Sequence, residues 1–394
     1  MAADFISFHR PSIGLEESEA VQRVLNSRWL TTGPVTQQFE HDFAAYVGSR
    51  YAVAVNSCTA ALQLALDAAG IGAGDEVLVP SYTFAATAAV VAHRGARPVL
   101  CDSVPGGFNI DPMDAQCRVT SRTKAIITVH LAGEPCDLNA LQELARRKSL
   151  HLIEDAAHAL PASYRGKRIG SISEFTAFSF YATKTITTGE GGMLATNNEA
   201  YAKRASVMRL HGIRGDAWKR YTSEGSWYYE VVDAGLKANM PDLLAAVGVA
   251  QLKKADAFHE RRCQISEIYR RGLGRIEELE MPPTGSADNS HSWHLFILRL
   301  RTASLEITRS DFINQLKENG IGTSVHFIPL HLHPYYQLIF GYRRGDFPHA
   351  EDAYSRCVSL PIYPDMTDCE VERVMSTVED IVVKKRRRVL VGAI

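Results

Sequence analysis

The segment Tyr51–Pro80, YAVAVNSCTAALQLALDAAGIGAGDEVLVP, contains the unit that decides the fold. Tyr51–Val55 is a short β-rich run, and an apolar helical pattern extends from Ala60 to about Ala69. A second short strand follows over Glu76–Val79. A strand, a helix and another strand in this order predict a right-handed crossover between parallel strands.

The same alternation continues along the first half of the chain. Another apolar helix is expected from Phe84, and further strand-like runs cover Pro98–Cys101, Ala125–Val129 and Leu152–Glu154. Short apolar strands that alternate with helices are typical of a mostly parallel sheet with helices on both faces. Ligands of such sheets bind beyond the carboxyl ends of the strands, so polar residues there are candidates for function.

The pattern changes after about residue 250. A charge-rich helical stretch over 251–273 leads to a strand-like run at His294–Leu300 and a helix at Ser310–Asn319. We therefore predict an α/β protein with a large domain over 1–255 and a smaller α+β domain over 256–394. The large domain includes an N-terminal helix near 15–26 and a turn-rich loop at 29–34.

Composition excludes several classes of protein. The chain has 394 residues, with 43 Lys and Arg against 44 Asp and Glu, so no overall field attracts nucleic acid or a membrane. Its seven cysteines are scattered without a CxxC pair, which argues against a disulfide framework or a metal site and favours a reducing compartment.

The start of the chain is not expected to be a signal peptide. The first residues lack a basic region followed by an apolar one, and the most apolar stretch, 84–92, is far shorter than the ~20 residues that span a bilayer. We expect a cytoplasmic protein without membrane insertion. The basic run Lys384–Arg388 fits a solvated helix end better than a nucleic-acid or membrane tail.

Lys184 is the first candidate for catalysis. It follows the aromatic run 178–181 and precedes a glycine-rich turn, which places it at a strand end. An exposed structural lysine is the ordinary alternative. An amine must lose its proton to act as a nucleophile, and a desolvated lysine does so below its free pKa of ~10.4.

Asp155 closes the strand that begins at Leu152, and His158 follows three residues later. A carboxylate here can point into the crevice, where pyridoxal 5'-phosphate (PLP) would need an acid partner for its pyridine nitrogen. Taken alone, such an aspartate is more often a helix N-cap, and such a histidine more often caps or faces solvent.

The turn Asn56–Thr59 joins a strand to a helix, so its free N–H groups and the helix dipole favour an anion. Thr59 adds a hydroxyl, and Ser179 is a second hydroxyl for a phosphate. Phe84 is able to stack on a planar ring, although a core aromatic is the default interpretation.

Together these segments resemble the DegT/DnrJ-type sugar aminotransferases, which belong to the fold-type I, aspartate aminotransferase-like group of PLP enzymes. The resemblance covers nearly the whole chain and is carried by WLTTGP, NSCTAALQLALDAAGIGAGDEVLVPSYTFAATA, VHLAGEPCDL, IEDAAHA, FSFYATKTITTGEGG, AGLKANMPDLLAAVGVAQL and LPIYPDMT. Within the family the chain is most similar to the branch that includes the 4-amino-4-deoxyarabinose transaminase.

The resemblance implies roles for individual residues. Lys184 matches the lysine that carries PLP as a Schiff base, and Asp155 matches the partner of the pyridine nitrogen. His158 corresponds to a residue near the phenolic oxygen of PLP. The other matches are Thr59, Ala60 and Ser179 to the phosphate, Phe84 to the stacking aromatic, and Gly33, His326 and His331 to substrate contacts.

The resemblance also implies partners. Asn239 matches an asparagine that reaches the cofactor phosphate of a neighbouring subunit, which implies a homodimer with shared active sites. The implied substrates are a nucleotide-linked keto sugar, aminated at carbon 3 or 4, and an amino-acid donor, glutamate. Arg214 or Lys219 is a candidate contact for the nucleotide charges, against the alternative of a solvated loop.

Two departures and several alternatives accompany this interpretation. Cys58 replaces a frequent glycine in the phosphate turn, and Lys237 replaces an aromatic before Asn239. Sugar dehydration, cyclitol amination and a non-catalytic regulatory role remain alternatives, although the dehydrating branch has histidine in place of Lys184. A Rossmann dehydrogenase would need a GxGxxG turn where this chain has Asn56–Thr59.

Overall fold

The computed structural model describes residues 5–214, 227–285 and 288–387. Its N-terminal part contains α1 (Leu15–Ser27), α2 (Pro34–Val47), β1 (Tyr51–Val55), α3 (Cys58–Ala68), β2 (Glu76–Pro80), α4 (Ala85–His93), β3 (Arg97–Cys101), α5 (Pro112–Cys117), β4 (Thr123–Val129), α6 (Leu138–Lys148), β5 (His151–Asp155), β6 (Ser163–Tyr164), β7 (Lys167–Arg168), β8 (Phe175–Ser179), β9 (Gly192–Thr196) and α7 (Glu199–Met208). The remainder contains α8 (Asp242–Leu273), β10 (Leu279–Glu280), β11 (Phe296–Leu300), α9 (Arg309–Glu318), α10 (Pro334–Phe340), α11 (Pro348–Arg356), β12 (Cys357–Leu360) and α12 (Asp368–Lys385).

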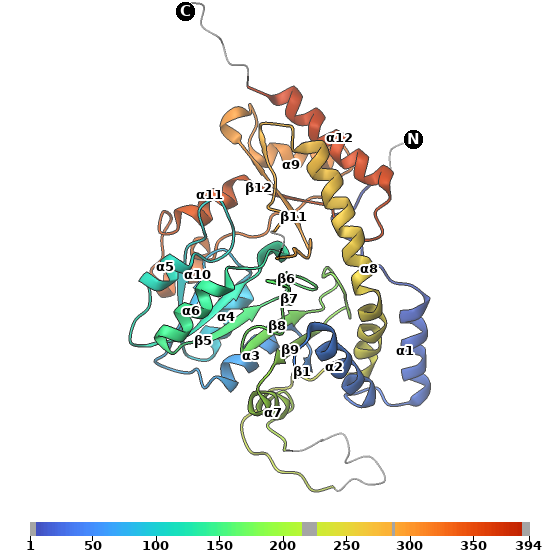
Figure 1. Cartoon of the computed structure of the whole chain (residues 1–394), viewed down its shortest axis with the longest axis vertical. Coiled ribbons are helices and arrows are strands. Elements are labelled where there is room, and N and C mark those ends of the chain that lie inside the picture. The colour runs from blue at the N-terminus through green and yellow to red at the C-terminus, as the bar shows by residue number, and fades with distance from the viewer. Residues whose placement is uncertain (1–4, 215–226, 286–287, 388–394) are drawn as a thin grey trace, which may run out of the picture.

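A seven-stranded sheet in the order β1-β9-β8-β5-β4-β2-β3 forms the centre of the larger part (Figure 1). The neighbours from β8 to β3 pair in parallel, whereas β9 is antiparallel to both β8 and β1. The sheet is therefore mostly parallel, as predicted. Its parallel strands bring the segments that follow β2, β4, β5 and β8 to one edge.

Helices cover both faces of this sheet because its strands are buried on both sides. Val53 and Val55 of β1 pack into a core with α3, α4 and α7, whereas Ala54 packs into the opposite core with α2, α5 and α6. This alternation follows from the two-residue repeat of a strand. Gly192 of β9 permits the close packing of α3, since a side chain there would meet the backbone of Ser57 at 2.4 Å.

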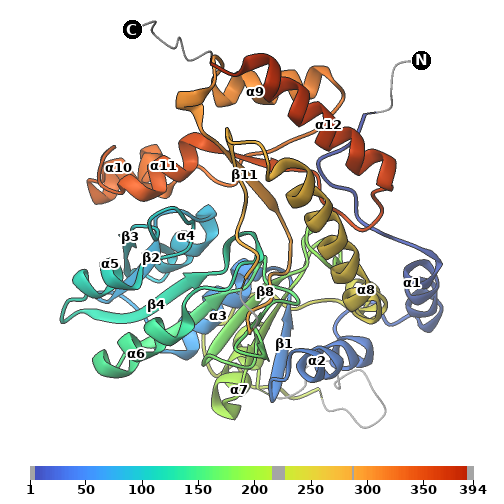
Figure 2. The same ribbon diagram turned by 45° about the horizontal axis from the view of Figure 1, so that its top comes forward.

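The smaller part is built around the antiparallel sheet β10-β11-β12, which α9, α12 and the second part of α8 cover (Figure 2). The predicted α+β character is confirmed. The proposed boundary at 255/256 falls inside α8, between Ala255 in the core of the large sheet and Ile265 in the core of the small one. Ile6 also pairs with Ile321, so the first described residues pack on the small part.

The helix α2 is an element that the sequence analysis did not predict. The turn at 29–33 is present as expected, but Pro34 then occupies the first helical position, where its missing N–H has no cost. The Asp242 carboxylate accepts hydrogen bonds from the N–H groups of Gly33 (2.8 Å) and Thr36 (2.9 Å) and thereby caps this helix. Asp242, which supplies this cap, is more than 200 residues away in the sequence, so no local pattern predicts the cap.

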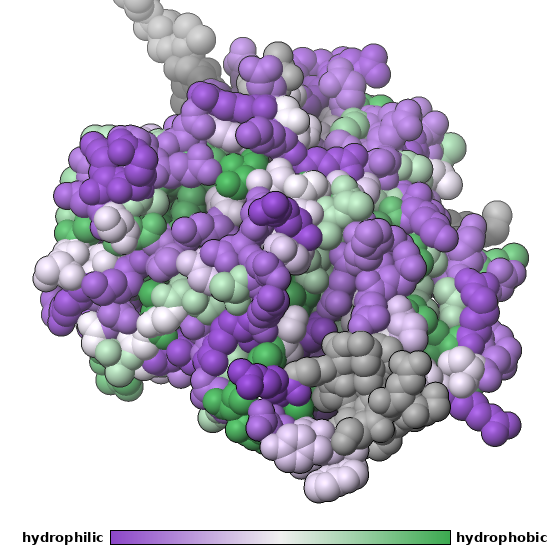
Figure 3. Space-filling view, turned by 60° about the horizontal axis from the view of Figure 1, so that its bottom comes forward, coloured by the Kyte–Doolittle hydropathy of each residue, from purple (hydrophilic) through white to green (hydrophobic). Residues whose placement is uncertain are grey.

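The surface has no extended apolar region on the face drawn in Figure 3, where small hydrophobic areas alternate with hydrophilic ones. None of the helices within the described ranges is long and apolar enough to cross a bilayer. Lys384 and Lys385 end α12, while Arg386 pairs with Glu278. The described part of the basic run is therefore a charged helix end.

Candidate active site

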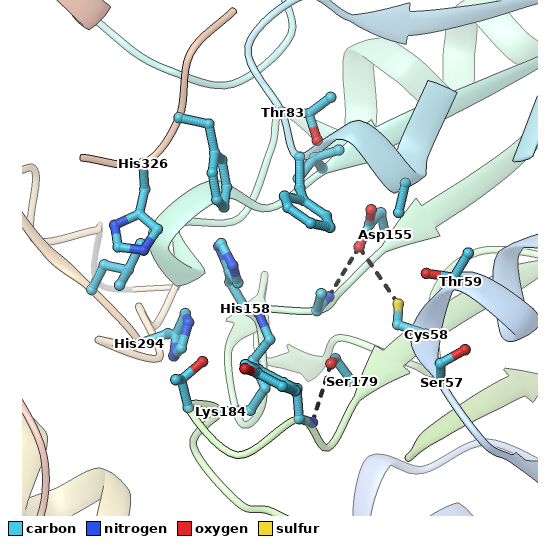
Figure 4. A pocket seen from close by; sticks show the side chains of 18 of the residues that line it. Ser57, Cys58, Thr59, Thr83, Asp155, His158, Ser179, Lys184, His294 and His326 are labelled. Atoms are coloured by element: carbon cyan, nitrogen blue, oxygen red, sulfur yellow. Dashed lines mark hydrogen bonds between the residues drawn. The ribbon is translucent and has the colours of Figure 1, made fainter. Parts of the chain in front are cut away.

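A cavity of about 540 Å³ opens at the carboxyl edge of the large sheet and is closed on its other side by the smaller part. Segments after β1, β2, β5 and β8 contribute Thr59, Phe84, Asp155, His158, Ser179 and Lys184 to its lining. Six residues that the sequence singled out therefore lie around one space, as strand-end positions in a parallel sheet predict. Figure 4 shows Lys184 and Asp155 approaching this space from different sides.

Lys184 lies in the turn after β8, where its backbone N–H donates to the carbonyl of Tyr181 at 2.9 Å. Burial lowers the pKa of its amine to about 8, although the charge of the nearby Asp155 acts in the opposite direction. Desolvation disfavours the charged form of lysine, which explains the sign. A substantial fraction of the amine is thus neutral and nucleophilic near physiological pH.

Asp155 ends β5 and is 5% exposed. Its Oδ2 accepts a hydrogen bond from Thr87 Oγ1 at 2.8 Å, and its Oδ1 accepts one from the N–H of Ala157 at 3.2 Å. Burial raises the pKa of this carboxyl group, while these two donors oppose the shift. Asp155 is therefore a buried acid that a cationic ligand group would readily keep ionised.

Thr87 was not found by sequence reasoning. It lies in α4, and its hydroxyl pairs with that of Thr83 at 2.8 Å while it donates to Asp155. Since a hydroxyl has a single hydrogen, Thr83 must donate to Thr87. The four-residue spacing of Thr83, just before α4, and Thr87, within α4, was the available signal, but nothing local connects it to Asp155.

His158 lies beside Lys184 and is 6% exposed. Its Nδ1 accepts the N–H of Ala132 at 3.2 Å, which leaves the ring proton on Nε2. Burial, followed by the charge of Lys184, lowers the pKa of His158 well below its ordinary value. His158 is thus a neutral hydrogen-bond donor at neutral pH.

An anion cradle lies at the start of α3. Ser57 caps this helix by accepting the N–H of Ala60 at 3.1 Å, so Ala60 itself is occupied and does not line the cavity. The first N–H groups of the helix have no partner within it and point with the helix dipole toward the cavity. The hydroxyls of Ser57, Thr59 and Ser179 gather on this side (Figure 4).

Cys58 is the first residue of α3 and lies close to Asp155. Its Sγ lies 3.5 Å from the carbonyl oxygen of Ala177 and 3.8 Å from Asp155 Oδ1, and its single hydrogen can be donated to either. Burial raises the pKa of the thiol well above its ordinary value, so Cys58 remains a neutral thiol. The departure from glycine thus adds a weak donor to Asp155.

Besides Ala60, the residues Gly33, Asn239 and His331, which the resemblance named, lie outside the cavity lining. The space beside Gly33 holds the ring of Trp29 and the carboxylate of Asp242, since an added Cβ would meet them at 2.2 and 2.9 Å. Asn239 donates to Thr32 at 2.6 Å and accepts from Lys237. The fully buried His331 pairs with Glu351 at 2.9 Å.

His326, in contrast, lines the cavity, with its Nδ1 2.9 Å from the Ser359 hydroxyl. Arg214 does not line the cavity; its side chain is 72% exposed and pairs with Glu230. Lys219 lies outside the described residues. Sequence reasoning also missed His294, Phe8 and His9, which reach the cavity from distant parts of the chain.

The lining fits PLP. A cavity of this size accommodates a small cofactor, its hydroxyls and helix start suit a phosphate, and the buried Asp155 carboxylate suits a pyridinium nitrogen. Lys184, whose pKa burial lowers to about 8, lines the same cavity. Fold and site together define the class as a fold-type I PLP-dependent aminotransferase.

Comparison with known proteins identifies the family. The model of the DegT/DnrJ/EryC1/StrS aminotransferase family matches residues 11–379. The spore coat polysaccharide biosynthesis protein SpsC of Bacillus subtilis is 50% identical over 379 residues, which cover 96% of this chain and 97% of SpsC. The chain belongs to this family and is a PLP-dependent sugar aminotransferase.

Solved structures agree with this assignment. Spr1654 of Streptococcus pneumoniae, which has been assigned as a sugar aminotransferase, superposes in its pyridoxamine phosphate (PMP) form with a TM-score of 0.91 and 33% identity, over 96% of this chain and 99% of Spr1654. Its PLP form gives a TM-score of 0.90. DesV of S. venezuelae gives a TM-score of 0.85 and 36% identity, over 93% and 94% of the two chains. The resemblance to the 4-amino-4-deoxyarabinose branch stays a prediction.

Proposed function

We propose that this enzyme transfers an amino group from glutamate to a keto sugar that is linked to a nucleoside diphosphate. The observation that carries the proposal is the placement of Lys184 and Asp155 on one cavity, the lysine with a pKa of about 8 and the aspartate 5% exposed. PLP, when bound, supplies the electron sink and carries the amino group between the two substrates. The similarity to SpsC, a protein of spore coat polysaccharide biosynthesis, supports a sugar as the acceptor.

Lys184 would hold the cofactor covalently and, once released, move a proton between the substrate carbon and the cofactor. A general base works best when its pKa lies near the working pH, and burial has brought Lys184 to about 8. The same amine then returns the proton as a general acid. A lysine at its free pKa of ~10.4 would be almost entirely protonated at neutral pH.

Asp155 would hold a proton on the pyridine nitrogen, and Thr87 would keep the carboxylate oriented and ionised through its 2.8 Å hydrogen bond. The charge-assisted hydrogen bond between Asp155 and the pyridine nitrogen would contribute about 1.5–3 kcal/mol. His158 would donate from Nε2 toward the phenolic oxygen, because Ala132 fixes its other nitrogen as an acceptor.

The cofactor phosphate would bind at the start of α3. Thr59 and Ser179 present hydroxyls there, and the helix terminus presents N–H groups. Ala60 would contribute through its place in the first turn, since its own N–H is donated to Ser57. Phe84, 60% exposed above the cavity, would cover the ring face.

The substrate contacts expected from the family fall into two groups. His326 lines the cavity and is available to a sugar. Gly33 and His331 lie outside this lining. A role for Gly33 therefore requires the second subunit, and a role for His331 requires either the second subunit or a change of its side-chain position. Arg214 and Lys219 remain candidates for the nucleotide phosphates.

We further propose that the enzyme acts as a homodimer with Asn239 facing the partner's cofactor phosphate. Asn239 is 8% exposed and its amide is held by Thr32 and Lys237, so it has a fixed orientation without lining its own cavity. Tyr181 lines the cavity yet is 47% exposed, which suits coverage by another subunit. Light scattering after size exclusion tests the dimer, and cell fractionation tests the expected cytoplasmic location.

A panel of nucleotide-linked 3-keto and 4-keto sugars, incubated with PLP-loaded enzyme and ¹⁵N-glutamate and read by mass spectrometry, tests the function. The expected product is a ¹⁵N-labelled amino sugar. A keto sugar that loses water without gaining nitrogen would establish dehydration instead. An enzyme that aminates cyclitol ketones but none of the nucleotide sugars would overturn the proposed substrate class.

A further inference from the structure

His294 is a residue of the cavity that neither the sequence analysis nor the proposed function uses. It precedes β11 in the smaller part of the molecule, more than a hundred positions after Lys184, and lines the cavity beside His158. The two imidazole rings lie 4.4 Å apart between centroids, at an interplanar angle of 40°. The side chain therefore faces the catalytic lysine from the opposite domain (Figure 4).

The two nitrogens of His294 differ in access. Nδ1 is sealed inside the protein and has no hydrogen-bond partner among the described residues. Nε2 is also unpaired by any described group, but it is not sealed in this way. The contents of the cavity can therefore reach Nε2 and not Nδ1.

The neighbouring histidines are held differently. Ala132 N–H fixes the tautomer of His158 at 3.2 Å, and Ser359 Oγ engages Nδ1 of His326 at 2.9 Å. No described hydrogen bond fixes the tautomer of His294. Its Nε2 can therefore act either as a donor or as an acceptor, which is what a sugar hydroxyl, itself both donor and acceptor, requires of a partner.

The neutral state of the His294 ring also favours a sugar oxygen as its partner. Burial, followed by the neighbouring His158 and Lys184, lowers the pKa of His294 well below its ordinary value, so the ring is neutral at physiological pH. A neutral imidazole is a weak partner for the carboxylates of an amino-acid donor, which favour cations. It suits an uncharged oxygen of the sugar instead.

Position also separates His294 from the cofactor phosphate. The hydroxyls of Ser57, Thr59 and Ser179 lie on one side of the cavity, and His294 and His326 lie on the other (Figure 4). A ligand group that meets Lys184 on this second side belongs to the substrate. We propose that Nε2 of His294 binds a hydroxyl or keto oxygen of the sugar and helps to select the acceptor; the inference rests on the proposed function.

Two variants separate hydrogen bonding from ring packing. His294→Phe keeps a ring to pack on His158 but has no polar atom, whereas His294→Gln loses the ring but places an amide near Nε2. His291→Phe is the control, since His291 is also buried, at 3% against 6% for His294, and packs on Trp293 outside the cavity lining. This control also loses the hydrogen bond that His291 Nδ1 accepts from the N–H of Trp293, so it reports on a local structural change that spares the cavity. The sugar is the panel member that wild-type enzyme aminates.

The two half-reactions are measured separately, together with binding of that sugar to the PMP form by calorimetry. His294→Phe should weaken sugar binding and kcat/KM for the sugar roughly 3- to 10-fold, the effect of one neutral hydrogen bond. His294→Gln should recover most of this loss, and His291→Phe should leave sugar binding unchanged. The half-reaction with glutamate, which also verifies folding and cofactor retention, should change less than about 2-fold in all three, below the effect of one hydrogen bond.

Equal losses in both half-reactions, or equal losses in His294→Phe and His294→Gln, would assign His294 a structural role and overturn the inference. Unchanged sugar binding in His294→Phe would also overturn it while the proposed function stands. If wild-type enzyme aminates no sugar of the panel, the proposed substrate fails and this inference fails with it.

Discussion

The hydrogen bond from Thr87 to Asp155 offers a direct test of how the site controls its cofactor. In Thr87→Val the side chain keeps its shape and burial but loses the hydroxyl that lies 2.8 Å from Asp155 Oδ2. That bond lowers the pKa of Asp155, against burial, which raises it. Its loss should therefore raise the pKa further and leave less of the carboxylate ionised at a given pH.

The size of the effect follows from the strength of the bond. A hydrogen bond to a charged group contributes about 1.5–3 kcal/mol. Since one pKa unit corresponds to about 1.36 kcal/mol, the pKa of Asp155 should rise by about one to two units. An aspartate needs to be ionised to hold a protonated pyridine, so PLP affinity is lost as the pH falls through this pKa.

The assay is the dissociation constant of PLP for the apo-enzyme between pH 5 and 8, measured by fluorescence. We expect the pH at which Thr87→Val loses affinity to lie about one to two units above that of wild type. The titration of PLP itself is common to both proteins and cancels in the comparison. Thr196→Val is the matched control, because Thr196 is fully buried and donates at 2.6 Å to the Glu174 carbonyl, at the opposite edge of the sheet.

Identical midpoints in wild type and Thr87→Val would show that Thr87 does not sustain the charge of Asp155. An equal shift in Thr196→Val would show that lost stability, and not the hydrogen bond, moves the midpoint. Either result refutes the reasoning.

Three further changes have defined outcomes. Lys184→Ala should abolish turnover and covalent cofactor attachment. In wild-type apo-enzyme, borohydride trapping of PLP should increase as the pH rises through about 8, because deprotonation frees the amine. Peptide mass spectrometry detects the attachment and the trapping, and trapping that does not change with pH would contradict the lowered pKa. Asn239→Asp should weaken PLP retention in the dimer by placing a like charge beside the partner's phosphate, and unchanged retention after dialysis would count against the shared site. Asp242→Ala should reduce the free energy of unfolding by at least the ~1–2 kcal/mol of a lost helix cap, measured by urea denaturation, and an unchanged midpoint would show that the bonds to Gly33 and Thr36 add nothing.

The strands β1 to β5 and the helices α3 and α4 of the large sheet were predictable because their signals are local. Tyr51–Val55 is β1 at the same residues, and the helix expected over 60–69 is α3 over Cys58–Ala68. Both depend on hydrophobic period and turn residues, which neighbouring positions carry. The helix α2 escaped prediction because its cap, Asp242, is contributed by a distant segment.

The residues of the site also divide into those that local sequence signals predict and those that they do not. Lys184, Asp155, His158 and Thr59 stand just after predicted strand-like runs, and a parallel sheet brings such positions to one edge. Ser179 is the last residue of β8 and reaches the same edge. The resemblance to a known family supplied roles for Gly33, His331 and Asn239, which the single chain places outside the cavity lining.

The sequence by itself determined that a parallel sheet forms and that a lysine, a carboxylate and hydroxyls end its strands, because strand period and turn chemistry act over a few residues. Tertiary structure alone decided that Thr87 donates to Asp155, that Ala132 sets the tautomer of His158 and that His294 closes the cavity from the smaller domain. The physical reason is that hydrogen bonds, burial and the resulting pKa shifts depend on distances in space between groups far apart in the chain, and only the packing of the two domains sets those distances.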